Sequence, residues 1–358
     1  MKKMVITIGL ALLVLLVIVG GLAWYFMNQP LYKPGMVCAQ KNLRAPLAPP
    51  EQPDDPAYWT VEEDVQLYHF SAGEGRNVLM VHGGPGFPDR EAWPGLEPLT
   101  EAYTFHYYDQ RGCGKSTRPI DTPSAGNFYQ NMQTVDQALG LGVQLADMER
   151  IRRILGEEKL ILIGHSFGGF LASLYAAEFP ERVEGLVLLA PANVLVMPQE
   201  DEGLFEAVRE QLPEEMREEY DAFMDDYFNF GNVFSKSEEE LIDMNRQLGR
   251  YLAAAVDSET GEIETVDQGR PAGWGVQAIY MSMGRRHDYR DALQAVVAPV
   301  LIIQGTEDAF QSEEVSRMYA NAFPNAELTL FEGAGHFPFA SHPDEFARVV
   351  GDFLGELE

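Results

Sequence analysis

The apolar residues at the start of the chain form one long run without charge. Residues 4–27 are 24 uncharged positions, and a helix of that length reaches roughly 36 Å, enough to cross a hydrocarbon core of about 30 Å. Two lysines precede the run, and a Trp-Tyr-Phe triplet near its end suits a membrane interface. We therefore expect residues 1–28 to form an N-terminal transmembrane helix, with the body of the protein outside the cytoplasm.

A cleaved signal peptide is the alternative for this run. Signal peptides carry a shorter apolar region followed by a small-residue cleavage site, and no such site stands directly after residue 27. A lipoprotein signal fits poorly, because Met36 and Val37 precede Cys38 where small residues are expected. Residues 29–57 are rich in proline and predict an extended tether.

Beyond residue 58 the apolar pattern alternates between short continuous runs and longer helical patterns. Short apolar runs occupy 78–82, 103–109, 160–164, 186–190, 300–305 and 328–331, and residues 65–70 alternate weakly. Runs that are apolar on both faces are typical of parallel strands covered by helices. Helical patterns cover 135–155, 167–179, 313–323 and 343–354. The alternation predicts an α/β fold with a mostly parallel, doubly wound sheet.

One stretch interrupts this alternation. Residues 194–290 contain helical patterns and no convincing strand. Because the stretch follows the end of a strand, we expect a helical cap above the carboxyl ends of the strands, where open α/β sheets bind ligands. The core domain is then formed by residues 58–193 and 291–358.

A candidate nucleophile lies between a predicted strand and a predicted helix. Residues 164–168 read Gly-His-Ser-Phe-Gly, which matches G-x-S-x-G. Its glycines permit the sharp turn that exposes a serine hydroxyl at the top of the sheet. A plain turn with a capping serine would look similar, but the strand–turn–helix context predicts that Ser166 is catalytic.

A serine nucleophile needs a base and a carboxylate that orients the base. His336 lies in a glycine-rich loop after the last predicted strand, and Asp308 follows the strand at 300–305. Glu307 is the alternative carboxylate, and His342 precedes a predicted helix start. Ser, Asp and His in this chain order are those of an α/β-hydrolase triad.

Backbone amides complete the predicted site. Residues 82–86 read His-Gly-Gly-Pro-Gly and follow a predicted strand. Glycines let backbone N–H groups approach a substrate oxygen closely, so we expect the N–H groups of Gly84 and Phe167 to form an oxyanion hole. One such donor contributes roughly 3 kcal/mol to transition-state stabilisation.

Composition excludes several other functions. Fifty-five acidic against 26 basic residues give a net charge of −29, whereas nucleic-acid binding requires a basic surface. Two cysteines cannot build a disulfide framework or a Cys-rich zinc site. No metal or organic cofactor is implied, and the oligomeric state is not indicated.

Three segments together resemble the proline iminopeptidase family of serine aminopeptidases within the α/β-hydrolase superfamily. They are HGGPG at 82–86, DQRGCGKS at 109–116, and the helix and elbow from 147 to 169. The resemblance covers residues 58–358. It implies the triad Ser166, Asp308 and His336 and a helical cap whose acids bind the free amino terminus of the substrate.

Two departures from the family pattern weaken the inference about the substrate. The residues flanking the serine are usually glycine and tryptophan, but here they are His165 and Phe167, as in general esterases. The acids that would bind an amine cannot be placed by motif, although 16 acids and only three bases lie between 200 and 243. Such a surface is either a solvated helix face or a site that attracts cations.

We therefore expect a serine hydrolase that releases an N-terminal proline or small apolar residue from peptides or amides. A membrane-associated carboxylesterase, lipase or lactonase with the same triad is the alternative. A non-catalytic binding scaffold is the third possibility, and the complete triad speaks against it.

Overall fold

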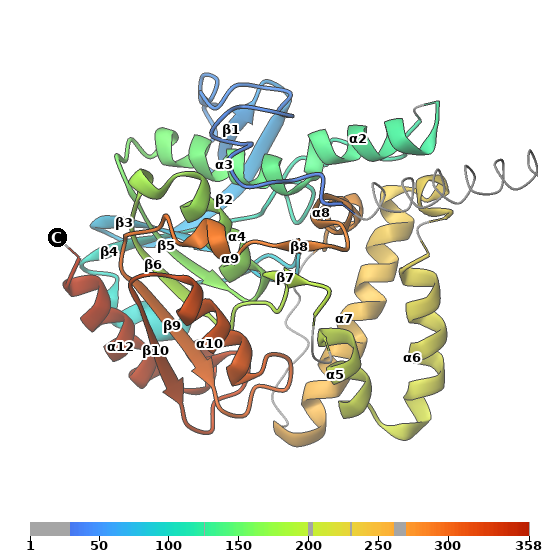
Figure 1. Cartoon of the computed structure of the whole chain (residues 1–358). Coiled ribbons are helices and arrows are strands. Elements are labelled where there is room, and N and C mark those ends of the chain that lie inside the picture. Colours follow the sequence, from blue (N-terminus) through green and yellow to red (C-terminus); the bar gives the residue numbers. More distant parts are fainter. Residues whose placement is uncertain (1–28, 125, 200–202, 230, 261–269, 358) are drawn as a thin grey trace, which may run out of the picture.

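An eight-stranded sheet runs through the centre of the computed structural model, which describes residues 29–124, 126–199, 203–229, 231–260 and 270–357 (Figure 1). The strands lie in the order β1-β2-β4-β3-β5-β6-β9-β10. Their bounds are β1 (Tyr58–Glu62), β2 (Val65–Gly73), β3 (Arg76–Val81), β4 (Tyr103–Tyr108), β5 (Leu160–His165), β6 (Val183–Leu189), β9 (Val300–Gly305) and β10 (Ala326–Phe331). Only β1 and β2 pair antiparallel to their neighbours, so the predicted mostly parallel α/β sheet is confirmed.

Helices cover both faces of this sheet. One face packs against α3 (Leu141–Ile154), α4 (Phe167–Glu178), α9 (Arg290–Leu293) and α10 (Glu313–Ala322). The other packs against the 3₁₀ helix η1 (Pro94–Leu99) and α12 (Pro343–Gly355). Each face of the sheet therefore has its own hydrophobic core. In β5, Leu162 packs in the core under α3 and α4, and its neighbour Ile163 packs in the core under α12. Strands covered on both sides must be apolar throughout, which explains why the continuous runs identified them.

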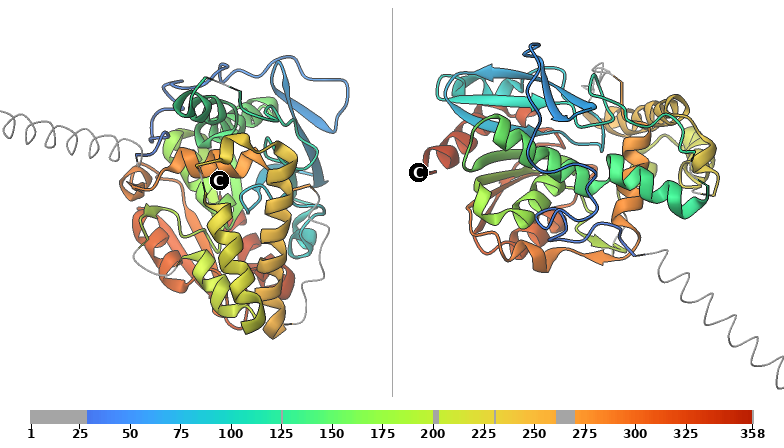
Figure 2. Two further views of the ribbon diagram at one scale, coloured as in Figure 1. Left: turned by 90° about the vertical axis from the view of Figure 1, so that its right-hand side faces the viewer. Right: turned by 90° about the horizontal axis from the view of Figure 1, so that it is seen from above.

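The chain between β6 and β9 forms most of a separate helical layer beside the sheet. It contains α5 (Leu204–Gln211), α6 (Glu214–Tyr227), α7 (Glu238–Thr260) and α8 (Trp274–Met283), and Figure 2 shows α5–α7 standing to one side of the sheet. The two ends of the insertion pair as short strands, β7 (Val196–Met197) with β8 (His287–Asp288). A pair of two-residue strands leaves almost no periodic signal, and the sequence did not predict it.

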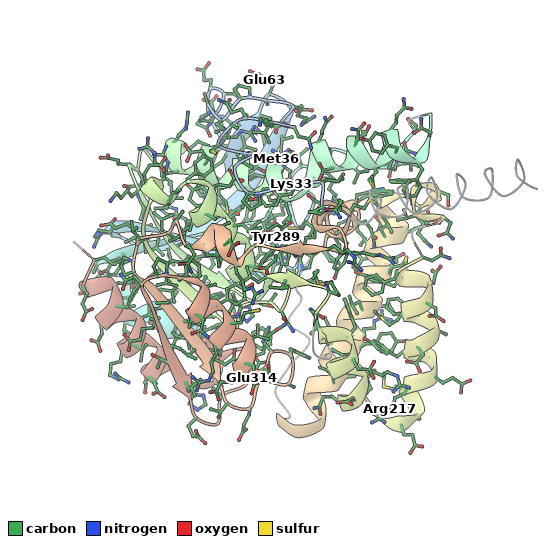
Figure 3. All side chains as sticks on the ribbon, viewed as in Figure 1. Lys33, Met36, Glu63, Arg217, Tyr289 and Glu314 are labelled. Carbon is green, nitrogen blue, oxygen red and sulfur yellow. The ribbon has the colours of Figure 1, made fainter. Side chains whose placement is uncertain are left out.

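Residues 29–57 pack on the α/β body, although the sequence predicted an extended tether. Tyr32 is 2% exposed and its ring lies edge-on to Tyr289 at 5.8 Å, and Figure 3 shows Lys33 and Met36 of the same segment close by. Glu178 at the end of α4 accepts hydrogen bonds from the Tyr32 hydroxyl and from three backbone N–H groups between residues 35 and 38. Proline limits regular structure but does not prevent docking, because each segment between prolines still offers apolar side chains and N–H groups.

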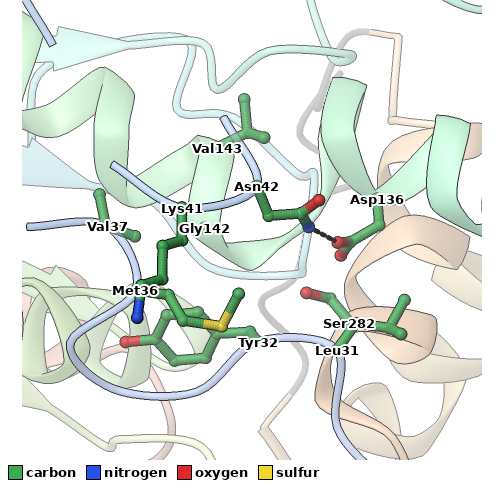
Figure 4. Close-up of a pocket in the computed structure, with 10 residues that line it drawn as sticks. All are labelled: Leu31, Tyr32, Met36, Val37, Lys41, Asn42, Asp136, Gly142, Val143 and Ser282. Carbon is green, nitrogen blue, oxygen red and sulfur yellow. Dashed lines mark hydrogen bonds between the residues drawn. The ribbon is translucent and has the colours of Figure 1, made fainter. Parts of the chain in front are cut away.

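This segment also closes a small cavity against the body (Figure 4). The cavity has a volume of about 10 Å³ and lies between the segment and residues of α2 (Phe128–Leu139), α3 and α8. Asn42 donates to the Asp136 carboxylate at 2.6 Å across it. Space for about one water molecule is typical of close packing.

The single helix predicted over 135–155 is divided at Gly140 into α2 and α3. The backbone of Gly140 is extended, and its N–H bonds to the Asp136 carbonyl. A side chain at Gly140 would overlap Asp136, so this tight corner requires glycine.

The predicted transmembrane helix at 1–28 lies outside the described residues. Among the helices that the structure does describe, none combines the length and the apolar character that a membrane span requires.

Candidate active site

Ser166 stands at the turn between β5 and α4. Its backbone has φ 53° and ψ −119°, a left-handed conformation that is unusual and strained for a residue with a side chain. A side chain on Gly164 would overlap the backbone of Gly168. A side chain on Gly168 would overlap the carbonyl oxygen of Val81. The two motif glycines therefore make room for the turn that presents the Ser166 side chain at the carboxyl end of the sheet.

Asp308 and His336 form the predicted hydrogen-bonded pair. The Nδ1 atom of His336 lies 2.8 Å from Oδ2 of Asp308, and the side chains are 8% and 0% exposed. Burial alone would raise the pKa of Asp308, but the charge and hydrogen bond of His336 and the N–H groups of Phe310 and Gln311 lower it below its usual value. An ionised carboxylate that accepts from Nδ1–H leaves Nε2 as the acceptor of a proton.

The alternative carboxylate and the second histidine lie elsewhere. Glu307 is exposed, and its N–H bonds to the Ala334 carbonyl. His342 contacts the hydroxyl of Ser341 and precedes α12. Of these candidates, the structure joins Asp308 to His336.

His165 ties the serine turn to the histidine loop. Its Nε2 donates to the backbone carbonyl of His336 at 2.8 Å, and the two rings lie 4.7 Å apart. Burial, together with the neighbouring His336, lowers the pKa of His165 to about 3. The side chain is therefore neutral at physiological pH, and its one ring proton is used to hold the loop that carries His336.

The HGGPG loop lies directly against the serine turn. A side chain on Gly83 would come within 3.1 Å of the Ser166 Cβ atom and of the His165 carbonyl oxygen. Gly84 has φ 119°, which favours glycine, and it is exposed beside the half-exposed Ser166. Among the described residues the N–H groups of Gly84 and Phe167 have no hydrogen-bond partner. Both predicted oxyanion donors are thus available for a ligand.

The loop at 109–116 contacts the HGGPG loop through hydrogen bonds between Gln110 and His82. His82 accepts from the N–H of Gln110 with Nε2 and donates from Nδ1 to the Gly83 carbonyl, so both ring nitrogens are used in the neutral form. Burial lowers the pKa of His82 to about 4. Cys113 is fully buried and burial raises the pKa of its thiol, which argues against a nucleophilic thiolate. Arg111 is buried between Asp147 and Glu62 and anchors this loop.

The acids of the helical insertion whose burial is described are exposed, with Glu238 as the exception. Every described carboxylate of α5 and α6 belongs to an exposed residue. Glu238 of α7 is buried, but Arg118 and the N–H groups of Gly273 and Trp274 occupy its oxygens. In the described part of the chain, the acidity of the insertion is therefore a solvated surface.

A cleft lies beside Asp308, between α5 and the start of α10. Its volume is about 420 Å³, and apolar side chains of Leu204, Ala207 and Phe310 contribute to its walls. The Phe310 ring also packs edge-on to His336 at 5.2 Å. Within the described residues no group of three His, Cys, Asp or Glu side chains is arranged to hold a metal ion.

Sequence reasoning missed the segment just before α8. Residues 270–274 touch both glycine loops: the Ala272 N–H bonds to the Gly86 carbonyl at 3.0 Å, and the Arg270 carbonyl accepts from Gly114. Arg-Pro-Ala-Gly-Trp matches no motif with a known mechanism. Its contacts join residues more than 150 positions apart, and no local pattern reports such contacts.

Comparison with known proteins agrees with this geometry. The model of the alpha/beta hydrolase fold family matches residues 76–343. A proline iminopeptidase of Heyndrickxia coagulans is 24% identical over 298 residues, which are 80% of this chain and 92% of that protein. A pimeloyl-[acyl-carrier protein] methyl ester esterase of Serratia marcescens is 25% identical over 289 residues, or 80% and 98% of the two chains. A solved membrane phospholipase A superposes with a TM-score of 0.53 at 21% identity, covering 100% of this chain and 99% of that one.

Proposed function

The chain belongs to the alpha/beta hydrolase fold family, and from that premise we propose that it is a serine hydrolase that acts through an acyl-enzyme on Ser166. The observation that carries the proposal is the hydrogen-bonded pair of Asp308 and His336, held through His165 beside a strained serine turn. Strain of this kind persists only where the surrounding structure enforces it, and it clusters at active sites.

In the proposed reaction the Ser166 hydroxyl attacks a substrate carbonyl while His336 Nε2 takes its proton. Asp308 keeps the imidazole in the required tautomer and stabilises its cation. The N–H groups of Gly84 and Phe167 stabilise the negative oxygen of the tetrahedral intermediate. His336 then protonates the leaving group, and a water molecule, deprotonated by the same histidine, releases the acyl group from Ser166.

The nucleophile assignment is tested with Ser166→Ala. We expect turnover to fall by about 10⁴-fold or more, as for serine enzymes that lose this residue, while the circular dichroism spectrum stays unchanged. Turnover of Ser166→Ala at the parental rate would contradict the assignment. A parent protein without activity on any substrate would favour the scaffold hypothesis.

For the substrate, we propose that the enzyme releases an N-terminal proline or small apolar residue. The support is the pair of glycine loops, which pack on each other through His82 and Gln110, and the resemblance to proteins named proline iminopeptidase. An ester substrate is the second candidate. It is favoured by the residues that flank Ser166 and by the absence of a buried, unoccupied carboxylate from the described part of α5–α7.

A substrate panel separates these two candidates. Rapid release of the chromophore from prolyl and alanyl arylamides would support the aminopeptidase. Hydrolysis of short acyl esters with no turnover of those arylamides would contradict it and support the esterase. Acetylating the amine of the prolyl arylamide is the matched control, because only an aminopeptidase should lose activity.

We also propose that residues 1–28 anchor the protein in a membrane with the catalytic domain outside the cytoplasm. The support is the uncharged run at 4–27 with lysines before it. The full chain should stay in the membrane fraction after a carbonate wash and keep its full mass. A soluble mature chain that lacks residues 1–27 would contradict this proposal and support a cleaved signal peptide.

A further inference from the structure

The end of the HGGPG loop is held by the helical insertion and not by the sheet. The Gly86 carbonyl accepts from the Ala272 N–H at 3.0 Å, and a side chain on Gly86 would come within 2.5 Å of the Ala272 Cβ atom. Gly86 has φ 78° and is buried. The close contact therefore requires glycine at 86 and fixes the backbone that follows Gly84.

Two side chains of the insertion hold Ala272 in turn. Asn245 of α7 donates from Nδ2 to the Ala272 carbonyl at 2.6 Å, and Tyr227 of α6 donates its hydroxyl to Asn245 Oδ1, also at 2.6 Å. Asn245 is 1% exposed and Tyr227 is 3% exposed. Hydrogen bonds of this length at buried positions are costly to break, because the groups left behind cannot bond to water.

The two ends of the HGGPG loop thus have different supports. His82 and Gln110 fix its start from the α/β body, whereas Tyr227, Asn245 and Ala272 fix its end from the insertion. The turn between them is closed by a bond from the Phe87 N–H to the Gly83 carbonyl at 3.3 Å. Figure 2 shows α6 and α7 side by side in the layer that supplies the second support.

We propose that Tyr227 and Asn245 are positioning residues that set the direction of the Gly84 N–H through Ala272 and Gly86. The proposal rests on the proposed serine hydrolase function, since it assigns Gly84 to the oxyanion hole. Oxyanion donors contribute only when they are fixed in advance toward the developing charge. A relay from the insertion would make that donor depend on how the helical layer is seated on the body.

Tyr227→Phe is the mildest test, because it removes one hydroxyl and keeps the ring. Asn245→Leu removes both links at once. The matched control is Tyr251→Phe: Tyr251 is also a buried tyrosine of the insertion, and its hydroxyl bonds to Glu219 and Gln247, away from residues 270–274. All three variants are made in the full chain.

The first measurement is hydrogen–deuterium exchange of the peptide that covers residues 82–90. We expect faster exchange in Tyr227→Phe and in Asn245→Leu than in the parent, and parental exchange in Tyr251→Phe. Equal exchange in all four proteins would overturn the relay. This readout needs no substrate, so it tests the relay from Tyr227 and Asn245 to the HGGPG loop separately from the hydrolase proposal.

The second measurement compares an acyl nitrophenyl ester with its thionoester. Sulfur is a weaker hydrogen-bond acceptor than oxygen, so a misaligned oxyanion hole slows the oxygen ester more than the sulfur analogue. We expect kcat for the oxygen ester to fall about tenfold in Asn245→Leu, with KM little changed, because one donor contributes about 10²–10³-fold when it is lost completely. A proportional loss for both esters would indicate general destabilisation and would overturn the positioning role.

Discussion

At the scale of single residues, Asp308 has the clearest role to test. Its carboxylate accepts from His336 Nδ1 and from two backbone N–H groups, and these bonds lower its pKa although burial opposes them. Asp308→Asn preserves the shape but permits the wrong imidazole tautomer. We expect kcat to fall by about 10³–10⁴-fold, measured at saturating substrate.

Glu307→Gln is the matched control for this substitution. Glu307 is the adjacent acid, and it is exposed to solvent. Its replacement should leave kcat within about twofold of the parent, because solvent screens the interaction between an exposed carboxylate and the reacting groups. A larger loss in Glu307→Gln than in Asp308→Asn would reverse the assignment of the orienting carboxylate.

Two buried histidines predict that the protein loses stability in mild acid. Burial lowers the pKa of His82 to about 4 and that of His165 to about 3, so in the folded state both stay neutral well below the usual value of 6.5. As the pH falls from 6.5 toward the pKa of each histidine in the folded state, the unfolded chain binds protons that the folded chain does not. The free energy of unfolding therefore falls over this pH range. At pH 4.5 the loss is at most about 2–3 kcal/mol for each histidine.

Urea unfolding at pH 7.5 and at pH 4.5 measures this effect. The difference between the two pH values should be smaller in His165→Gln than in the parent, because glutamine has no proton to gain. Glutamine can still donate to the His336 carbonyl, which limits the direct cost at pH 7.5. An identical difference in the two proteins would mean that His165 is not the origin of the acid sensitivity.

At the scale of elements, the glycine turn between β5 and α4 makes a sharp steric prediction. Gly168→Ala would push a methyl group into the Val81 carbonyl of β3, so we expect a loss of about 3 kcal/mol or more in the free energy of unfolding. Gly142 of α3 is the control, because a side chain there would lie 3.6 Å from Val37, an ordinary contact.

Gly142→Ala should be neutral or stabilise the protein by up to about 1 kcal/mol through helix propensity. Gly142 and Gly168 both lie in the first turn of a helix, so helix propensity cancels in the comparison and the steric term remains. Thermal unfolding of the two variants checks the prediction. Equal melting temperatures would show that β3 and α4 can move apart at this turn.

The elements also show what local sequence can predict. β9 was predicted with its observed bounds, because a strand covered on both faces must be apolar throughout. The division of α2 from α3 at Gly140 was missed, since apolar spacing continues across it. Ser166, Asp308 and His336 could be predicted from motif and chain order. The relay through Tyr227 and Asn245 could not, because its partners meet only after the insertion folds onto the body.

At the scale of the whole molecule, the docking of residues 29–57 determines how the proposed anchor would connect to the enzyme. Glu178 holds this segment through four hydrogen bonds between residues 32 and 38, and Tyr32 and Val37 join the main hydrophobic core. A free tether would let the catalytic domain rotate relative to the membrane. With the anchor that we propose, a docked segment would leave only a few residues between the membrane and the body and would restrict the orientation of the domain.

Glu178→Gln tests this docking directly. The amide cannot accept at both former oxygens, so backbone N–H groups of residues 35–38 lose partners and the segment should detach more often. Trypsin can cut after Lys41 and after Arg44. We expect cleavage there to be at least about tenfold faster than in the parent, which corresponds to about 1.4 kcal/mol of lost docking energy. The control is Glu181→Gln, which changes a nearby acid whose only described ion pair is a 3.7 Å contact with Arg182.

Parental cleavage rates in Glu178→Gln would mean that apolar contacts hold the segment without the carboxylate. Rapid cleavage of the parent itself would instead support the free tether that the prolines predicted.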